Sequence, residues 1–264
     1  MDGVTGARRA YLDHAATTPL RPEARAAMEP YLTTEFGNPS GSHAEARRAR
    51  RATDDAREEL AGLLGADFGE IVFTSGGTEA DNLAVFGSVD EEERESVTGS
   101  IVCTAIEHPT VLAACRVRAE RFGARLAEVG AGKDGIIDLD ALDEACGEDV
   151  GFVSVMAVNN ELGTVQPIDA VSEVVRRRAP SATLHTDAVQ AAPWLDVANL
   201  AAVADLVAIS AHKFGGPKGV GALVARNGTT VRPLLFGGGQ ERERRSGTSN
   251  VAGVVGMAAA LPAT

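Results

Sequence analysis

Residues 205–226 read DLVAISAHKFGGPKGVGALVAR, in which a glycine-rich connection joins two apolar segments. The first segment, 205–212, has apolar side chains on both alternations, as expected of a strand buried on both faces of a parallel sheet. The second, 221–226, has the length and composition of another buried strand. Lys213 therefore stands where a buried strand ends, at the edge of a parallel α/β sheet where ligands bind.

The rest of the chain alternates similar apolar runs with segments of helical period. This pattern is typical of a parallel sheet covered by crossover helices. Further strands are expected over 70–76, 100–108, 124–130, 151–159 and 182–188. Helices are expected over 21–32, 43–65, 78–89, 109–123, 138–146 and 169–179, and an exposed loop over 90–95.

Composition narrows the function classes. The chain has 264 residues, 44% of them hydrophobic, and a formal net charge of -12, which repels polyanions, so direct nucleic-acid binding is not expected. The N-terminus lacks the apolar stretch of a signal peptide, and Asp205 interrupts the most apolar segment, which predicts a cytoplasmic protein without membrane contact. Cys103, Cys115 and Cys146 form no CxxC pair and are expected to be inert packing residues.

Polar residues follow several of the predicted strands. The turn 75–79, SGGTE, precedes a helix and could bind an anion through its backbone N–H groups, although it could equally be an ordinary turn with a helix cap. His108 ends the next strand and could be structural or functional. Asn160 and Gln190 add amides after two further strands.

Asp187 and Lys213 indicate which kind of ligand these strand ends could bind. A buried carboxylate needs a cationic partner, either a protein arginine or the protonated nitrogen of a ligand. A lysine at a dry strand end loses solvation, which lowers its pKa and favours imine formation with an aldehyde. Together, the phosphate cradle, imidazole, amides, carboxylate and lysine suit pyridoxal 5'-phosphate, and no metal is expected.

Eight collinear stretches carry a family resemblance. They are YLDHAATTPL (11–20), FGNPSGSH (36–43), EIVFTSGGTEADNLA (70–84), EHPTVL (107–112), VNNELGTVQPI (158–168), HTDAVQ (185–190), SAHKFGGPKGVGAL (210–223) and GGGQERERRSGTSN (237–250). The chain resembles the cysteine desulfurases of the class V aminotransferase group. The motifs RSGT and YLDHAATT are more similar to those of the housekeeping and nitrogen-fixation branch than to those of the other main branch.

The resemblance implies the large domain of a fold type I pyridoxal-phosphate-dependent transferase, a mainly parallel sheet with helices on both faces. Residues 1–13 would belong to a smaller domain and residues 14–256 would form the cofactor-binding large domain. Residues 257–264 would begin a linking helix whose remainder, with most of the small domain, is missing.

The resemblance also implies roles around the cofactor ring. Lys213 would bind the aldehyde, and Asp187 would keep the pyridine nitrogen protonated. His108 would stack on the ring and take part in proton transfer. Asn160 and Gln190 would bond the phenolic oxygen and help to place the substrate.

A second group of implied residues would hold the phosphate. It consists of Gly77, Thr78, Ser210 and His212 from one chain and Thr248 from a neighbouring subunit. A site shared in this way implies a homodimer. One departure from the family, Glu243-Arg244 where relatives usually have glycine and an apolar residue, bears on the geometry of the loop around Thr248.

The implied reaction converts L-cysteine to L-alanine and passes sulfur to an enzyme cysteine, then to iron-sulfur cluster or tRNA thiolation acceptors and their scaffold proteins. Relatives carry that cysteine in a mobile loop beyond the point where this sequence stops, together with an arginine for the substrate carboxylate. None of the three cysteines here lies in such a loop. A C-terminally truncated fragment, inactive alone, is the favoured interpretation.

Other interpretations stay open at this stage. The chain could be half of a split enzyme, or a protein that keeps the cofactor and has changed its reaction. Another class V enzyme, such as an aminotransferase or selenocysteine lyase, would share the same cofactor groups. A non-catalytic partner subunit with this fold would lack a bound cofactor altogether.

Overall fold

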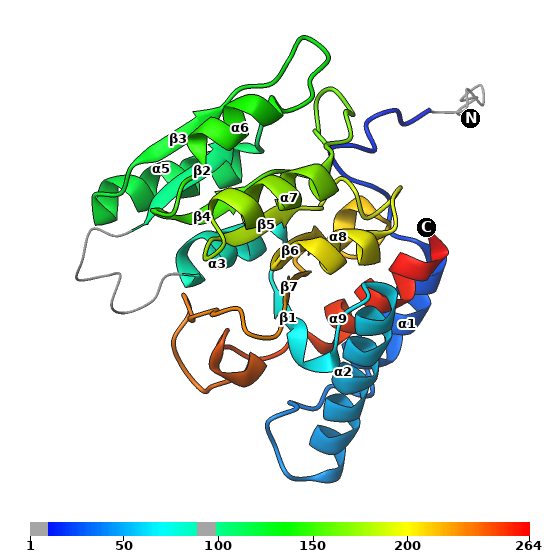
Figure 1. Cartoon of the computed structure of the whole chain (residues 1–264). Coiled ribbons are helices and arrows are strands. Elements are labelled where there is room, and N and C mark those ends of the chain that lie inside the picture. Colours follow the sequence, from blue (N-terminus) through cyan, green and yellow to red (C-terminus); the bar gives the residue numbers. More distant parts are fainter. Residues whose placement is uncertain (1–9, 89–98) are drawn as a thin grey trace.

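The computed structural model describes residues 10–88 and 99–264, so the predicted loop 90–95 lies outside the described residues. It contains one seven-stranded sheet with the strand order β1-β7-β6-β5-β4-β2-β3 (Figure 1). The strands are β1 (Ile71–Thr74), β2 (Ser100–Thr104), β3 (Leu126–Val129), β4 (Val150–Ser154), β5 (Thr183–Asp187), β6 (Leu206–Ser210) and β7 (Gly221–Ala225). All seven predicted strands are present.

The pairing of the strands confirms the mainly parallel sheet. Five neighbouring strands of the sheet pair in parallel, in the order β3, β2, β4, β5 and β6, whereas β7 is antiparallel to both β6 and β1. Most strands are shorter than predicted because the polar residues after each apolar run leave the sheet. After β6, for example, a 3-10 turn begins at Ala211 and contains Lys213.

Among the described residues, the helices confirm the six predicted segments, and two further helices are present. The helices are α1 (Pro22–Leu32), α2 (Ala44–Leu63), α3 (Gly77–Gly87), α5 (Pro109–Phe122), α6 (Leu139–Ala145), α7 (Ile168–Arg178), α8 (Val197–Val203) and α9 (Val251–Ala260). The short α8, capped by Asp196, was not predicted. Residues 257–260 of the expected linking helix lie in α9, which begins at Val251, and its role as a link between domains stays a prediction. Within the described ranges, every helix is too short or too polar to span a bilayer.

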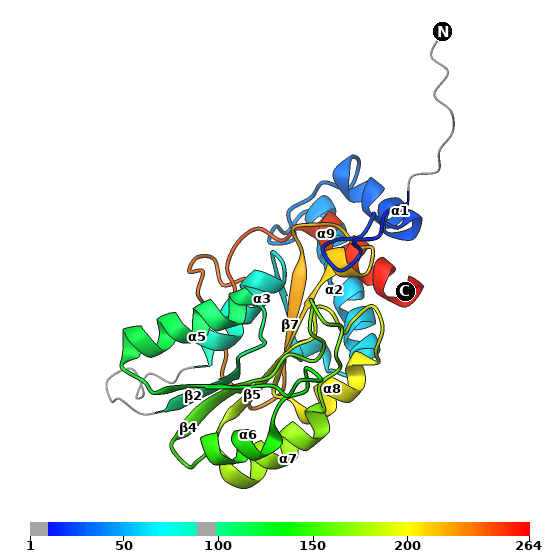
Figure 2. The same cartoon turned by 90° about the horizontal axis from the view of Figure 1, so that it is seen from above.

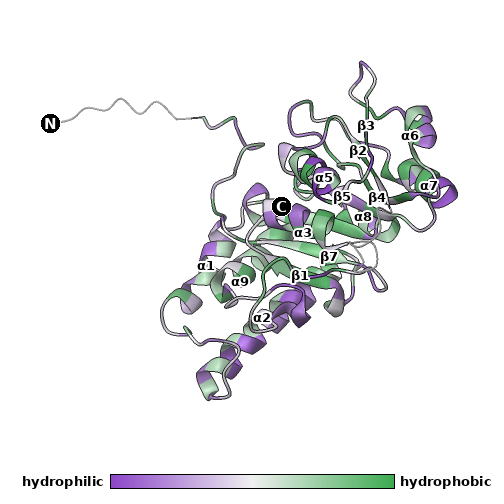
Figure 3. Ribbon diagram, turned by 90° about the vertical axis from the view of Figure 1, so that its left-hand side faces the viewer, coloured by the Kyte–Doolittle hydropathy of each residue, from purple (hydrophilic) through white to green (hydrophobic). Residues whose placement is uncertain are grey.

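Helices cover both faces of the sheet (Figure 2). On β6, Leu206 and Ala208 pack with the side chains of α3 and α5, whereas Val207 and Ile209 belong to the larger core under α2, α6, α7 and α8. Because both faces are covered, both alternations of the strand must be apolar. The ribbon coloured by hydropathy accordingly shows the strands as apolar and the outer helix surfaces as polar (Figure 3).

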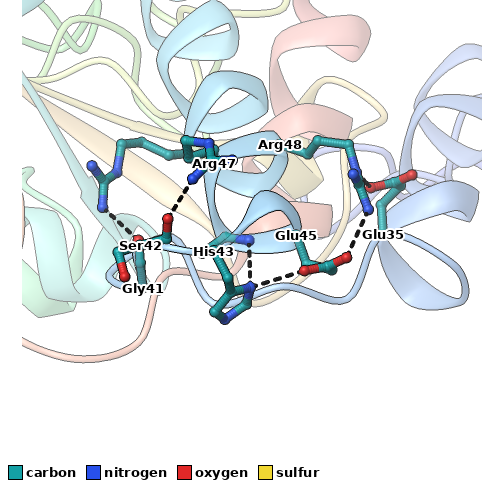
Figure 4. Close-up of polar contacts among 9 residues, drawn as sticks. Glu35, Gly41, Ser42, His43, Glu45, Arg47 and Arg48 are labelled. Atoms are coloured by element: carbon teal, nitrogen blue, oxygen red, sulfur yellow. Dashed lines mark hydrogen bonds and ion pairs between the residues drawn. The ribbon is translucent and has the colours of Figure 1, made fainter.

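The long helix α2 shows how the charged cluster of the sequence is arranged. His43 caps its first turn by accepting a hydrogen bond from the N–H of Ala46, and Arg48 pairs with Glu35 at 2.6 Å (Figure 4). Arg47 donates to the carbonyl of Ser42. These exposed contacts order the loop before α2 without burying charge, so each contributes little to stability.

A buried ion pair anchors the loop that departs from the family pattern. Arg57 of α2 binds both carboxylate oxygens of Glu241 at 2.8 Å, and the N–H of Phe73 in β1 donates to the same carboxylate at 3.0 Å. Glu241, Arg242 and Glu243 have positive φ values of 50°, 56° and 66°. Left-handed backbone costs a non-glycine residue about 1–2 kcal/mol, so the ion pair must offset strain in this turn.

We expect Glu241→Ala to lower the free energy of unfolding by about 3–5 kcal/mol, because it leaves Arg57 buried without its anion. Glu243→Ala is the matched control, since Glu243 is also left-handed but exposed and should change stability by less than about 0.5 kcal/mol. Urea unfolding of both variants measures the difference. Equal effects of the two substitutions would contradict the anchoring role.

Candidate functional site

A cleft of about 570 Å³ lies at the carboxyl ends of the central strands. Its walls come from the start of α3, the turn after β6 and the N-terminal segment around Ala16 and Thr17. Nine of the ten predicted site residues line it: Gly77, Thr78, His108, Asn160, Asp187, Gln190, Ser210, His212 and Lys213. The fold thus brings together residues that are up to 136 positions apart in the sequence, from Gly77 to Lys213.

The start of α3 forms a cradle suited to an anion. Gly77 opens the helix, and a Cβ there would lie 2.8 Å from a methyl group of Val189 and 3.4 Å from the Cβ of Ser210. Gly76 at the N-cap has no side chain to cap this helix, and Gly76, Gly77 and Thr78 all line the cleft. Backbone N–H groups and the helix dipole favour a phosphate at such a point.

His212 and Ser210 close the other side of this cradle. Ser210 is buried at the end of β6, and His212 Nδ1 lies 3.1 Å from the hydroxyl of Thr17. Burial and then the neighbouring Lys213 lower the pKa of His212. The imidazole is therefore neutral near pH 7 and can offer a hydrogen bond without adding charge.

Asp187 is the buried carboxyl of the cleft floor. It is 5% exposed, and its Oδ1 accepts a hydrogen bond from the N–H of Val189 at 2.8 Å. Burial, followed by the carboxyl of Asp81, raises the pKa of Asp187 to about 7. Within the described part of the chain no ion pair joins it to a cationic side chain, so a cationic ring nitrogen would complete its environment.

Lys213 lies half-buried in the 3-10 turn after β6, the strand next to the one that ends at Asp187. Its ammonium group donates to the carbonyl of Ala15 and, at 3.1 Å, to that of Ala16. Burial lowers the pKa of Lys213, and the negative charges of Asp187 and Asp13 oppose this shift. The amine is thus closer to its neutral, nucleophilic form than an exposed lysine.

His108 both caps α5 and lines the cleft. Its Nδ1 accepts the N–H of Thr110 at 3.2 Å and lies 2.8 Å from the hydroxyl of the same residue, which caps α5. An accepting Nδ1 leaves the proton of the neutral ring on Nε2. The cap thereby fixes both the ring orientation and the tautomer at the cleft.

The two amides line the cleft but have protein partners. Asn160 donates to Glu161 Oε1 at 3.1 Å, and Gln190 donates to the carbonyl of Ala15 at 2.7 Å. Thr248 is exposed and is not among the residues that line this cleft. Its contact with the phosphate of a neighbouring subunit stays a prediction.

Sequence reasoning missed several lining residues. Thr17 lies in the quoted stretch YLDHAATTPL, but no role was assigned to it. Asp81 lies four positions after Gly77 on α3, where a carboxylate within an apolar helical face could have been noticed. The burial of His185 within β5 could have been found in the same way, as a polar side chain inside an apolar run.

Comparisons with known proteins point to one family. Residues 10–263 match the family model described as aminotransferase class-V. The chain is 43% identical over 96% of its length to the cysteine desulfurase IscS of Dictyoglomus turgidum and, at the same identity and coverage, to a putative cysteine desulfurase IscS 1 of Bacillus subtilis. It spans 63% and 65% of those two relatives.

Solved structures show the same fold. A NifS-like protein and "SspA in complex with cysteine" each superpose with a TM-score of 0.90 and 37% sequence identity over 96% of this chain. The superpositions cover 69% and 72% of those chains.

We expect Asp187→Asn to shift the pH profile of Lys213 acylation to lower pH. Removing the negative charge that favours the ammonium form lowers the pKa of Lys213 further, so more amine is neutral at a given pH. Peptide mass spectrometry of the cofactor-free chain quantifies the labelling, with Lys133 and Lys218 as internal references and the exposed Asp169→Asn as control. A profile that stays in place or moves to higher pH would show that the two groups do not interact.

Proposed function

Because this chain belongs to the aminotransferase class-V family, whose members are pyridoxal-phosphate-dependent, we propose that it supplies the cofactor site of a cysteine desulfurase. The observation that carries the proposal is the placement of Lys213 and Asp187 at the ends of two adjacent parallel strands, beside a glycine cradle for an anion. Amine, carboxylate and anion cradle match the aldehyde, ring nitrogen and phosphate of one cofactor.

Different residues of the cleft would bind different parts of the cofactor. Gly77, Thr78, Ser210 and His212 would hold the phosphate, with Thr248 of a second copy completing that site in a homodimer. The cofactor supplies an aldehyde that combines with amines and a ring that accepts electrons. Two amides, Asn160 and Gln190, would exchange their present partners for the phenolic oxygen and the substrate.

The proton-carrying residues would decide the reaction. Asp187 would pair with the ring nitrogen and favour its protonated form, which would strengthen the ring as an electron acceptor. His108 would lie against the ring and could move a proton at Nε2, because Thr110 holds its Nδ1 as an acceptor. Lys213 would hold the aldehyde, and its Nζ could accept or return a proton.

L-cysteine is the proposed substrate and L-alanine the product. The reaction breaks the Cβ–S bond, passes the sulfur to a cysteine thiolate and places a proton on Cβ. The relatives named as cysteine desulfurases and the cysteine complex of a similar structure support this assignment. Transfer onward to acceptor proteins for iron-sulfur clusters or tRNA thiolation, in the cytoplasm, belongs to the same proposal, as does the division at residues 14–256 into a cofactor-binding domain.

Borohydride reduction of the chain saturated with pyridoxal phosphate should make the link permanent on Lys213. Peptide mapping is expected to find the label on the peptide containing residue 213, and Lys213→Ala should abolish it. Lys218→Ala is the matched control, because this lysine also lines the cleft but is exposed. Label on Lys218, or a chain that stays colourless with excess cofactor, would refute the proposed function.

The three thiols of this chain should not accumulate persulfide when it is incubated with cofactor and L-cysteine. Cys103, Cys115 and Cys146 are all at most 2% exposed. A hydrogen bond with Cys115 and burial raise the pKa of Cys103, and burial raises that of Cys146 to about 11. Because the thiolate is the reactive form, these groups are poor sulfur acceptors. Alkylation and mass spectrometry measure persulfide, and its detection on any of the three would contradict this prediction.

A further inference from the structure

A buried row of polar side chains runs beneath the cleft and has no part in the roles assigned so far. Asp81 Oδ1 on α3 faces His185 Nε2 on β5 at 3.5 Å, and His185 Nδ1 lies 2.9 Å from Ser154 Oγ on β4. Ser154 Oγ in turn donates to Glu107 Oε1 at 3.4 Å. All four residues are at most 4% exposed.

Ordinary packing does not account for this row. Asp81 Oδ1 and His185 Nε2 form no regular hydrogen bond with any other group in the described ranges, so each depends on the other. Buried polar groups in that situation cost stability, and apolar residues at positions 81 and 185 would avoid the cost. The row lies directly under Asp187, two residues beyond His185 on the same strand.

Three carboxyl groups are crowded here, and they cannot all be ionised. Burial raises the pKa of Asp81 to about 8 and that of Glu107 well above its usual range. The pKa of Asp187 is raised less, to about 7. Burial lowers the pKa of His185 to about 4, so its imidazole is neutral at pH 7.

Hydrogen-bond donors decide which of the two cleft-lining carboxyls, Asp81 or Asp187, takes the charge. Asp187 Oδ1 accepts the N–H of Val189 at 2.8 Å, and a donated hydrogen bond favours the ionised form. In the part of the chain that the structure describes, Asp81 accepts no backbone N–H, and its buried Oδ1 is paired only with the imidazole of His185. The proton therefore belongs on Asp81 and the charge on Asp187.

We propose that Asp81 is a positioning residue that keeps its proton against His185 Nε2, so that Asp187 alone carries the negative charge facing the ring nitrogen of the bound cofactor. Neutral His185 then holds its own proton on Nδ1 and donates it to Ser154 Oγ, whose hydroxyl donates to Glu107. The inference rests on the proposed function, because the ring nitrogen is that of pyridoxal phosphate.

The neighbours of Asp81 set the pH at which this arrangement fails. The titratable groups on the elements around it are Glu79 on α3, His185 and Asp187 on β5, Glu107 after β2, Cys115, Arg116, Arg118, Glu120 and Arg121 on α5, and His108 and Lys213 in the cleft. The guanidinium of Arg118 lies 5.1 Å from the ring of Phe152, and that ring stacks on the imidazole of His185 at 6.0 Å. The positive charge of Arg118 therefore disfavours a second positive charge on His185. The spans of β1, β6 and β7 bring no titratable side chain.

Carboxyl carbon NMR of the cofactor-free chain, labelled at aspartate, tests the proton directly. The Asp81 resonance, assigned by its loss in Asp81→Asn, is expected to titrate near pH 8, and the resonance of Asp205, which pairs with Arg176, serves as the reference. Asp205→Asn is the matched control and should leave the Asp81 titration in place. An Asp81 carboxyl that is already ionised at pH 6 overturns the inference.

Stability supplies a second readout that needs no assignment. Folded Asp81 binds its proton more tightly than the unfolded chain does, so stability falls as the pH rises from the usual aspartate range toward 8. Asp81→Asn should remove about one proton from the pH slope of unfolding, an effect absent from Asp205→Asn. If Asp81→Asn does not fold, the titration of the unsubstituted chain, followed by the infrared band of a protonated carboxyl, decides the question.

Cofactor binding separates this inference from the proposed function. Asp81→Asn, which keeps a neutral side chain able to donate, should bind pyridoxal phosphate within about threefold of the unsubstituted chain, whereas Asp81→Ala should lose about tenfold. Equal losses in both variants would indicate a merely structural residue and overturn the inference. Failure of the unsubstituted chain to bind pyridoxal phosphate would refute the proposed function instead, while the titration of Asp81 would still be measured.

Discussion

The burial of a carboxyl group at the end of β5 is the constraint on which the rest of the site depends. A negative charge on buried Asp187 is costly without a cation, and no ion pair joins it to a cationic side chain in the described residues. The parallel register places Asp187 beside Ala208, so the chain after β6 delivers Lys213 to the same cleft. A ligand with a basic ring nitrogen and an aldehyde would satisfy the carboxyl and react with the lysine.

Much of this arrangement could be predicted because buried strands appear in the sequence as recognisable apolar runs. Apolar runs, several of them apolar on both alternations, predicted all seven strands, and polar residues directly after those runs had to meet at one edge. What could not be predicted depends on tertiary contacts. Burial of Asp81 and His185 results from the packing of α3 on β5, and α9 is a glycine-containing segment that becomes helical between α1 and α2.

The loop that contains Glu243-Arg244 shows the same limit of prediction from the sequence. The sequence alone indicated only that Glu243-Arg244 replaced a glycine and an apolar residue. The structure shows a left-handed turn held by Glu241 through Arg57, and Arg245 pairs with Glu79 on the helix that opens the anion cradle. The loop that bears Thr248 is thus tied to α2 and β1 through Glu241 and to α3 through Arg245, which compensates for residues without glycine's freedom.

The protonation state of the ring nitrogen tests the central claim most directly. Pyridoxal phosphate labelled with ¹⁵N in the ring can be bound to the chain and observed by NMR at neutral pH. The account predicts a protonated nitrogen in the unsubstituted chain and loss of that proton in Asp187→Asn. A nitrogen that is unprotonated in the unsubstituted chain, or one whose proton persists without the carboxylate, would contradict it.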